Sequence, residues 1–122
     1  MKCSRNCKQI DLEKLNLGFK HADYMLDCGD LVVVVEETGR SKLEDVDKLD
    51  NTIGWLYSQR ESRGYSNFVG ILHCFREISP HVSKSLSARM QRARKHGMRV
   101  TYKTANCEDH LKHLLGEYNI IC

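Results

Sequence analysis

Residues 22–38 read ADYMLDCGDLVVVVEET, and this stretch decides the fold. Asp23 opens a short extended segment, a tight turn follows at Asp27–Asp30, and a continuous apolar run occupies Leu31–Val35. Four consecutive valines favour a β-strand, because their branched side chains fit a pleated sheet better than a helix. A strand that is apolar on both faces is typical of the centre of a sheet that helices cover on both sides.

Helical and strand patterns alternate along the rest of the chain. They predict a short helix over Lys8–Asn16, an extended segment over Phe19–Leu26, a helix from the capping box Ser41–Glu44 to about Ser58, a polar loop over 59–67, a strand over Phe68–Phe75, a helix from Ser79-Pro80 to Gly97, a strand over Met98–Lys103 and a last helix capped by Asn106. The prediction is therefore one α/β domain, residues 1–122, with a central mixed β-sheet flanked by helices.

Length and composition are those of a single globular domain. The chain has 122 residues, of which 41% are hydrophobic and 29% are charged. No apolar run is long enough to cross a bilayer, and the polar N-terminus does not have the pattern of a signal peptide. We therefore expect a cytoplasmic protein without a membrane partner. The net charge of +3 is too small to identify a partner by itself.

Six cysteines show no CxxC pair and no zinc-finger spacing. Reduced structural cysteines are the expected state in a cytosolic protein. The alternative is a disulfide or a metal cluster that joins the two termini through Cys3, Cys7 and Cys122.

Asp23 and Glu36 are the candidate chemical site. Strand alternation puts Val34, Glu36 and Thr38 on one face, and a hairpin through the Asp27–Asp30 turn brings Asp23 opposite Glu36. Two adjacent carboxylates repel each other unless a cation or a proton lies between them. A Mg²⁺ ion held there could activate water and polarise a phosphate. The alternative is that Asp23 only begins a strand and that Glu36 lies at a solvated strand end.

Asp23, twelve intervening residues and then Glu36-Glu37-Thr38 resemble the motif of the PD-(D/E)XK nuclease superfamily, which includes archaeal Holliday-junction resolvases and many restriction endonucleases. The resemblance covers roughly residues 11–75 and implies a restriction-endonuclease-like fold. It implies that Asp23 and Glu36 hold Mg²⁺ or Mn²⁺, and that Glu13 on the first helix joins the site. It also implies a nuclease-like domain that acts on nucleic acid.

Thr38 departs from this resemblance, because the family places a catalytic lysine there. Lys42, at the start of the following helix, is the candidate replacement. Lys48 on the same helix and Lys20 on the preceding segment are alternatives. The remaining alternative is that Thr38 marks a loss of catalysis.

A basic surface forms the second candidate site. The segment from Ser79 to Cys107 contains no Asp or Glu. This acid-free segment predicts contact with nucleic-acid phosphates, and its alternative is a solvated helix face. The predicted nucleic-acid-binding residues are Lys84, Arg89, Arg92, Arg94, Lys95 and Arg99.

Together these features predict a metal-dependent endonuclease, with DNA rather than RNA as the expected substrate. The chain contains no nucleophile elbow and no P-loop, which argues against hydrolases and NTPases of those types. One alternative is a catalytically degenerate nucleic-acid-binding protein on the same fold, and another is a small interaction or assembly protein. Because the chain is short for a protein that handles duplex DNA, a homodimer is a further expectation.

Overall fold

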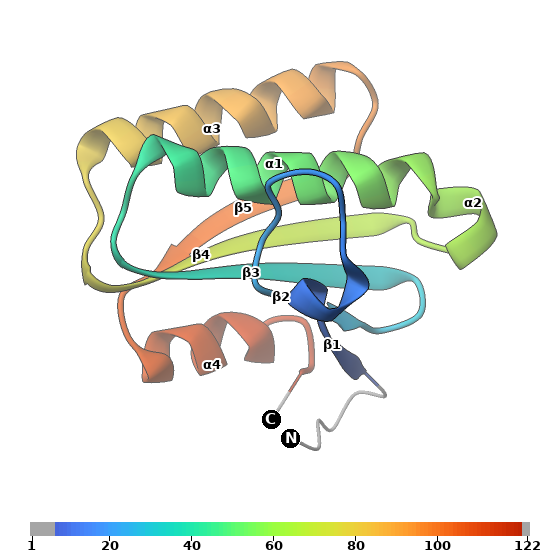
Figure 1. Ribbon diagram of the computed structural model, residues 1–122, viewed down its shortest axis with the longest axis horizontal. Coiled ribbons are helices and arrows are strands. Elements are labelled where there is room, and N and C mark those ends of the chain that lie inside the picture. The colour runs from blue at the N-terminus through green and yellow to red at the C-terminus, as the bar shows by residue number, and fades with distance from the viewer. Residues whose placement is uncertain (1–6, 121–122) are drawn as a thin grey trace.

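A computed structural model describes residues 7–120, and these form one five-stranded sheet with the strand order β1-β2-β3-β4-β5 (Figure 1). β1, β2 and β3 pair antiparallel, whereas β3, β4 and β5 pair parallel. The predicted α/β class with a mixed sheet flanked by helices is confirmed, and the arrangement is compatible with a restriction-endonuclease-like fold. The strands are β1 Lys8–Asp11, β2 Tyr24–Asp27, β3 Leu31–Arg40, β4 Asn67–Glu77 and β5 Val100–Ala105.

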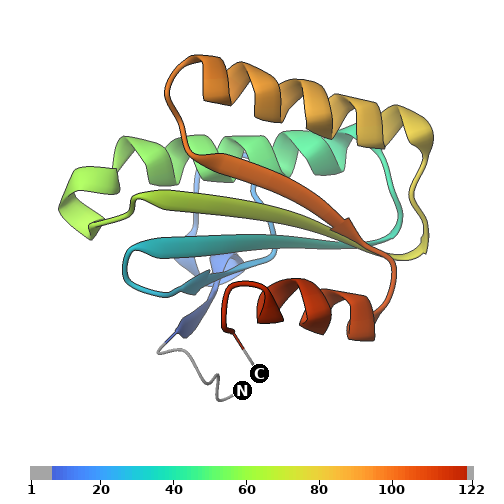
Figure 2. The same cartoon turned by 180° about the vertical axis from the view of Figure 1, so that it is seen from behind.

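Helices cover both faces of this sheet. α1 and α3 lie side by side on one face and α4 lies on the other, as the two opposite views show (Figures 1 and 2). The parallel connections from β3 to β4 and from β4 to β5 pass through α1 and α3 respectively. The helices are α1 Leu43–Ser58, α2 Arg60–Arg63, α3 Pro80–Lys95 and α4 Glu108–Gly116, and a 3₁₀ turn, η1, spans Leu12–Leu15.

The core is divided into two layers by the alternation of side chains along β3. Val32 and Val34 pack with residues of α1 and α3, whereas Val33 and Val35 pack with residues of α4. All four valine side chains are fully buried. The prediction that this strand is central and covered on both faces is therefore confirmed.

The predicted helix over Lys8–Asn16 is wrong in its first half. Lys8–Asp11 forms the edge strand β1, in which Ile10 pairs with Met25 of β2. Only the turn η1 follows, and the Asp11 carboxylate caps it by accepting a hydrogen bond from the Glu13 N–H at 3.0 Å. Pairing with a distant strand thus outweighs the local helical spacing, which is too short to form a stable helix.

The capping box of α1 lies one residue later than predicted. The N-cap is Lys42, whose N–H donates to the Asp45 carboxylate at 2.9 Å. Ser41 instead ties β4 to the start of α3, because its hydroxyl donates to the Glu77 carbonyl and accepts from the Ser79 N–H. The predicted cap of α3 is confirmed, since the Ser79 hydroxyl accepts from the Val82 N–H at 3.2 Å.

Other boundaries also shift. β3 continues beyond its apolar run to Arg40, with an irregular register between Thr38 and Arg40. The predicted loop over 59–67 contains the short helix α2. Cys107, and not Asn106, caps α4, with its sulfur accepting from the His110 N–H.

A disulfide joins Cys7 to Cys28, so the expectation of reduced cysteines is wrong for this pair. It fastens the residue before β1 to the turn between β2 and β3. Cys74 and Cys107 are free thiols, and Cys3 and Cys122 lie outside the described residues. Disulfides are uncommon in a reducing cytosol, so the cytoplasmic location stays a prediction. No helix within residues 7–120 is long and apolar enough to span a membrane.

Side chains from α3 cover the outer edge of β5. The Arg94 guanidinium donates through Nε to the Val100 carbonyl at 3.0 Å, and the Tyr102 N–H donates to the Met90 sulfur at 3.4 Å. These contacts satisfy backbone groups that an edge strand otherwise presents to solvent.

Gly70 in β4 is expected to tolerate no side chain. A Cβ at this position would lie 2.5 Å from Cδ1 and 2.6 Å from Cε1 of Tyr102, whose buried ring is fixed by a hydrogen bond to Asp50. Gly70→Ala should therefore lower the free energy of unfolding by about 1–3 kcal/mol in urea denaturation. Gly54→Ala on the exposed side of α1 is the control, because a Cβ there meets nothing and alanine favours the helix. Equal stability of the two variants would contradict the packing argument.

Candidate active site

Asp23 and Glu36 lie near each other where the pairing of β2 with β3 ends. Tyr24 pairs with Val35, and Asp23 occupies a bend just before β2, with its N–H donating to the Val35 carbonyl at 3.2 Å. Alternation along β3 points the Glu36 side chain to the same face as Val34, and the charge of Asp23 is close enough to raise the pKa of Glu36. Asp23 thus approaches Glu36 from a bend and not from a residue of the paired strand.

Main-chain contacts fix the position of Asp23. Its Oδ2 accepts a hydrogen bond from the Glu37 N–H at 2.7 Å, and its carbonyl accepts from the Leu12 N–H at 3.0 Å. The preceding residue, Ala22, is tied to α1, because its N–H donates to the Thr52 hydroxyl at 2.9 Å. The Glu37 N–H therefore holds the Asp23 carboxylate against β3, while the neighbouring main chain is bonded to Leu12 and Thr52.

Glu36 is a buried acid with an incomplete set of partners. Its side chain belongs to the core, and the residue is only 2% exposed. Oε2 lies 3.3 Å from the Lys48 ammonium, whereas no hydrogen-bond partner for Oε1 exists among the described residues. Burial raises the pKa of the Glu36 carboxyl to about 8; the negative charge of Asp23 adds to the rise and Lys48 opposes it. The protein thus has an acid that loses its proton only with difficulty unless positive charge is added nearby.

Lys48 supplies the cation of this site. It lies in the second turn of α1, the helix that packs over β3, and its ammonium reaches Glu36 across the layer. Burial alone would lower the pKa of Lys48, but the carboxyl groups of Glu36, Asp45 and Glu44 together outweigh burial and raise that pKa above its usual value. The cation beside the two acids therefore comes from the helix and not from the strand.

The other candidates for the catalytic lysine are placed differently. Lys42 is exposed and contributes its backbone to the cap of α1. Lys20 forms an exposed ion pair with Glu44 at 3.1 Å. Thr38 donates its hydroxyl to the Arg40 carbonyl at 3.1 Å, where the strand becomes irregular.

Glu13 is not brought into contact with the paired acids. It lies exposed on η1, with Oε1 3.9 Å from Nε2 of His21. No hydrogen bond or ion pair within residues 7–120 links its side chain to Asp23 or Glu36. Its expected role in the site therefore has no contact to support it.

A second acid–base pair on the opposite sheet face was not predicted. Oε2 of Glu37 lies 3.1 Å from Nδ1 of His73, which is fully buried, and Nε2 of His73 has no partner among the described residues. Alternation along β3 could have placed Glu37 on this face. Its partner could not be predicted, because His73 follows 36 residues later on β4.

The basic segment is only partly available for a ligand. Arg89 bridges to α1 through Asp47 at 2.6 Å and Asp50 at 2.9 Å. Arg94 is bound to β5. The four others are exposed and form no ion pair in the part of the chain that the structure describes: Lys84, Arg92, Lys95 and Arg99.

These four exposed cations do not form one surface. α3 begins beside the ends of β3 and β4 and runs back toward their starts (Figure 1). Lys84 therefore lies toward the end of the sheet where β3 finishes, whereas Arg92 and Lys95 lie toward the other end. Arg99 joins the latter pair, because its carbonyl accepts from the Phe68 N–H where β4 begins.

Arg89→Ala is expected to affect stability and not nucleic-acid binding. The variant leaves the half-exposed carboxylates of Asp47 and Asp50 without their cation. It should lower the free energy of unfolding by about 1–2 kcal/mol. Urea denaturation measures this loss, and fluorescence anisotropy with labelled DNA measures binding. Arg92→Ala is the control, because Arg92 is exposed and unpaired within the described residues. Weaker DNA binding by Arg89→Ala without a loss of stability would contradict this assignment.

The donor set of the site partly fits a divalent cation. No group of three or more His, Cys, Asp and Glu side chains within residues 7–120 is arranged to hold a metal ion. Asp23 and Glu36 nevertheless offer the carboxylate oxygens that Mg²⁺ prefers, and the unpartnered Oε1 of Glu36 fits a site for positive charge. Mg²⁺ commonly completes its coordination with water and substrate phosphate, so two carboxylates are a sufficient protein contribution.

Comparison of the chain with family models, with curated proteins and with solved structures gives no match in any of the three.

Proposed function

We propose that the protein is a metal-dependent nucleic-acid phosphodiesterase that acts as an endonuclease, with DNA as the expected substrate. The observation that carries this proposal is the buried Glu36 carboxyl, which lies beside Asp23 and 3.3 Å from the Lys48 ammonium and retains an unpartnered oxygen. Two acids that can hold a divalent cation, with one lysine beside them, can support hydrolysis of a phosphodiester.

Each residue has a distinct role in the proposed reaction. Asp23 and Glu36 would hold Mg²⁺ or Mn²⁺, which would supply an activated water and polarise the scissile phosphate. The Glu37 N–H holds Asp23 in position. Lys48 stabilises the negative charge that develops on the phosphate as water attacks phosphorus and the P–O bond to the leaving group breaks. The proton released by the attacking water passes to solvent, and the leaving oxygen takes one up.

A non-catalytic nucleic-acid-binding protein is the second candidate function. The observation that favours it is the closure of the site, because Glu36 is only 2% exposed and is already paired with Lys48. In that case the acid–lysine pair would serve the stability of the core, and the exposed cations of α3 would bind phosphates without cleavage.

Metal binding and cleavage, measured together, test the proposal. Wild-type protein should bind Mn²⁺ in calorimetry and cut a labelled branched or duplex DNA in Mg²⁺ or Mn²⁺. Asp23→Ala/Glu36→Ala should lose both properties, because no carboxylate of the pair remains. The matched control is Glu61→Ala/Asp109→Ala, which removes the same charge from two exposed acids on α2 and α4.

Three results would contradict the proposal in different ways. Unchanged cleavage by Asp23→Ala/Glu36→Ala would mean that the catalytic site is elsewhere. Salt-dependent DNA binding without cleavage would support the second candidate. Absence of DNA binding at low ionic strength would remove both and leave a small interaction or assembly protein.

A further inference from the structure

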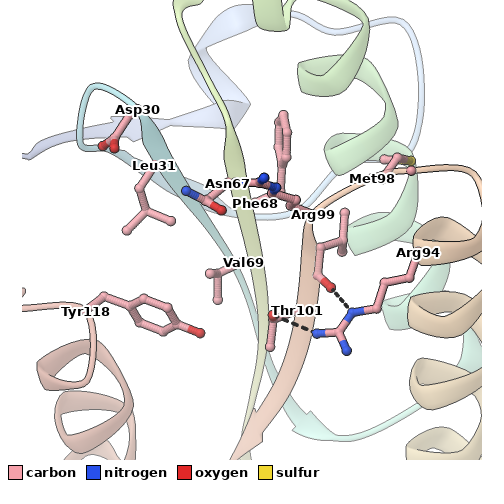
Figure 3. A pocket seen from close by; sticks show the side chains of 12 residues that line it. Asp30, Leu31, Asn67, Phe68, Val69, Arg94, Met98, Arg99, Thr101 and Tyr118 are labelled. Atoms are coloured by element: carbon pink, nitrogen blue, oxygen red, sulfur yellow. Dashed lines mark hydrogen bonds between the residues drawn. The ribbon is translucent and has the colours of Figure 1, made fainter.

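A cavity of about 730 Å³ opens at the end of the sheet where β3, β4 and β5 begin. It is separate from the paired acids, because Leu31 at the start of β3 lines it, whereas Glu36 lies toward the other end of that strand. Its polar lining includes Asn67, Arg94 and Arg99, and Tyr118 after α4 forms another wall (Figure 3).

Arg94 is held in a fixed orientation at this cavity. Its Nε donates to the Val100 carbonyl at 3.0 Å, and one terminal nitrogen donates to the Thr101 hydroxyl at 3.2 Å (Figure 3). A guanidinium has five N–H donors, so these two bonds leave others for a ligand. A pre-oriented guanidinium suits a phosphate, which it can bind through two parallel hydrogen bonds.

The charges around the cavity favour an anion. Arg94 and Arg99 both line it, and Arg99 is exposed and has no ion pair within residues 7–120. Asp30 is the acid among the lining residues. It already has an interaction partner in the protein, and Figure 3 places it on the same side of β4 as Tyr118, across that strand from Arg94. Arg94 and the aromatic wall therefore line the same cavity from different sides of β4.

The size and the apolar walls of the cavity favour a ligand larger than a bare phosphate. Pockets that enclose small organic ligands have volumes of about 300–1,000 Å³, and this cavity lies in that range. Leu31, Val69 and Met98 supply apolar surface, and Tyr118 presents an aromatic ring. Aromatic rings bind nucleobases by stacking in a way that tolerates different bases.

We propose that this cavity binds a nucleotide, with its phosphate on Arg94 and Arg99 and its base against the apolar wall beside Tyr118. The ligand chemistry is the same for a free nucleotide and for one nucleotide of a strand. This proposal for the cavity does not depend on the proposed catalysis at Asp23 and Glu36. If nucleic acid is the substrate, the cavity holds a nucleotide of the strand away from the bond that is cut.

Titration of ¹⁵N-labelled protein with AMP, adenosine, inorganic phosphate and a twelve-nucleotide oligo-dT strand tests the proposal. AMP should shift the amide signals of Val69, Thr101 and Tyr118 and should bind about tenfold or more tightly than either adenosine or phosphate, because it uses both parts of the cavity. Arg99→Glu should weaken AMP binding about tenfold or more. Lys84→Glu is the matched control, since it makes the same charge change at the other end of α3 and should weaken AMP about threefold or less.

The outcomes distinguish a free nucleotide from a nucleotide of a strand, and some of them would overturn the proposal. Shifts with AMP support a free nucleotide as ligand, and shifts of the same amides with oligo-dT but not AMP support a strand. Equal loss in Arg99→Glu and Lys84→Glu, or shifts elsewhere with every probe, would overturn the site. Arg94→Lys should also weaken binding if it folds, because lysine lacks the planar fork. Glu36→Gln should leave AMP binding unchanged, so failure of this site and failure of the catalytic proposal are distinguishable.

Discussion

Lys48→Ala is expected to lower metal-dependent DNA cleavage by about 10²–10³-fold, as for loss of one charge-stabilising group. The ammonium of Lys48 is the cation 3.3 Å from Glu36, and it comes from α1, whereas β3 has threonine at position 38. Thr38→Lys in the Lys48→Ala background should restore part of the rate. Position 38 lies on the same strand face as Glu36, so a lysine there can extend toward the same carboxylates.

Cleavage rates under single-turnover conditions measure this effect. Lys42→Ala is the control, because Lys42 is exposed and caps the same helix. Urea denaturation of Lys48→Ala must accompany the assay, since Glu36 then remains buried without its cation. Wild-type rates in Lys48→Ala, or an equal loss in Lys42→Ala, would show that Lys48 does not act in cleavage.

Glu36→Gln is expected to remove a large pH dependence of stability in metal-free buffer. The folded protein raises the pKa of Glu36 to about 8 from a usual value of 4.5. Between these values the folded state holds a proton that the unfolded state has released, so the free energy of unfolding falls as pH rises. This loss of unfolding free energy is complete above about pH 8. It amounts to a few kcal/mol, because each pKa unit of difference between the folded and unfolded states corresponds to about 1.4 kcal/mol. Glutamine stays neutral and does not incur this loss.

Urea denaturation from pH 5 to pH 9 measures the difference in the free energy of unfolding between wild type and Glu36→Gln. The contributions of the other titrating groups cancel in this difference. The variant should become the more stable protein at the alkaline end. Glu61→Gln, at an exposed acid on α2, should follow wild type throughout. Adding Mg²⁺ at pH 8 should stabilise wild type and not Glu36→Gln. A difference that does not change with pH would contradict a proton on buried Glu36.

The elements that could be predicted are those whose signals are local. The valines of β3 specify a central strand because their shape and apolarity act within the strand itself. Ser79-Pro80 specifies the start of α3 because a cap needs a hydroxyl and a backbone N–H three residues apart. β1 could not be predicted, because Lys8–Asp11 becomes a strand through pairing with β2 and through the disulfide to Cys28. Both interactions depend on residues far along the chain.

In the candidate site, too, local signals could be predicted and contacts between distant elements could not. Alternation and one tight turn predicted that Asp23 lies near Glu36, but not that Asp23 occupies a bend outside β2. The choice among the lysines could not be made, because it depends on how α1 is rotated over β3 and which of its turns faces the acids. The ion pairs of Arg89 could not be predicted for a similar reason, because its carboxylate partners lie on α1, about forty residues earlier. The roles of these residues in catalysis and binding stay predictions.

The cover that α3 places over β5 limits how two copies of this chain could associate. A protein aggregates or dimerises through a sheet when an edge strand offers its N–H and carbonyl groups to a strand of another molecule. At β5 the Val100 carbonyl and the Tyr102 N–H are already bonded to Arg94 and Met90, so this edge is a poor template for an added strand. A homodimer built by joining two sheets into one would therefore have to meet at β1, only four residues long. Such a dimer would have its two disulfides close to the seam.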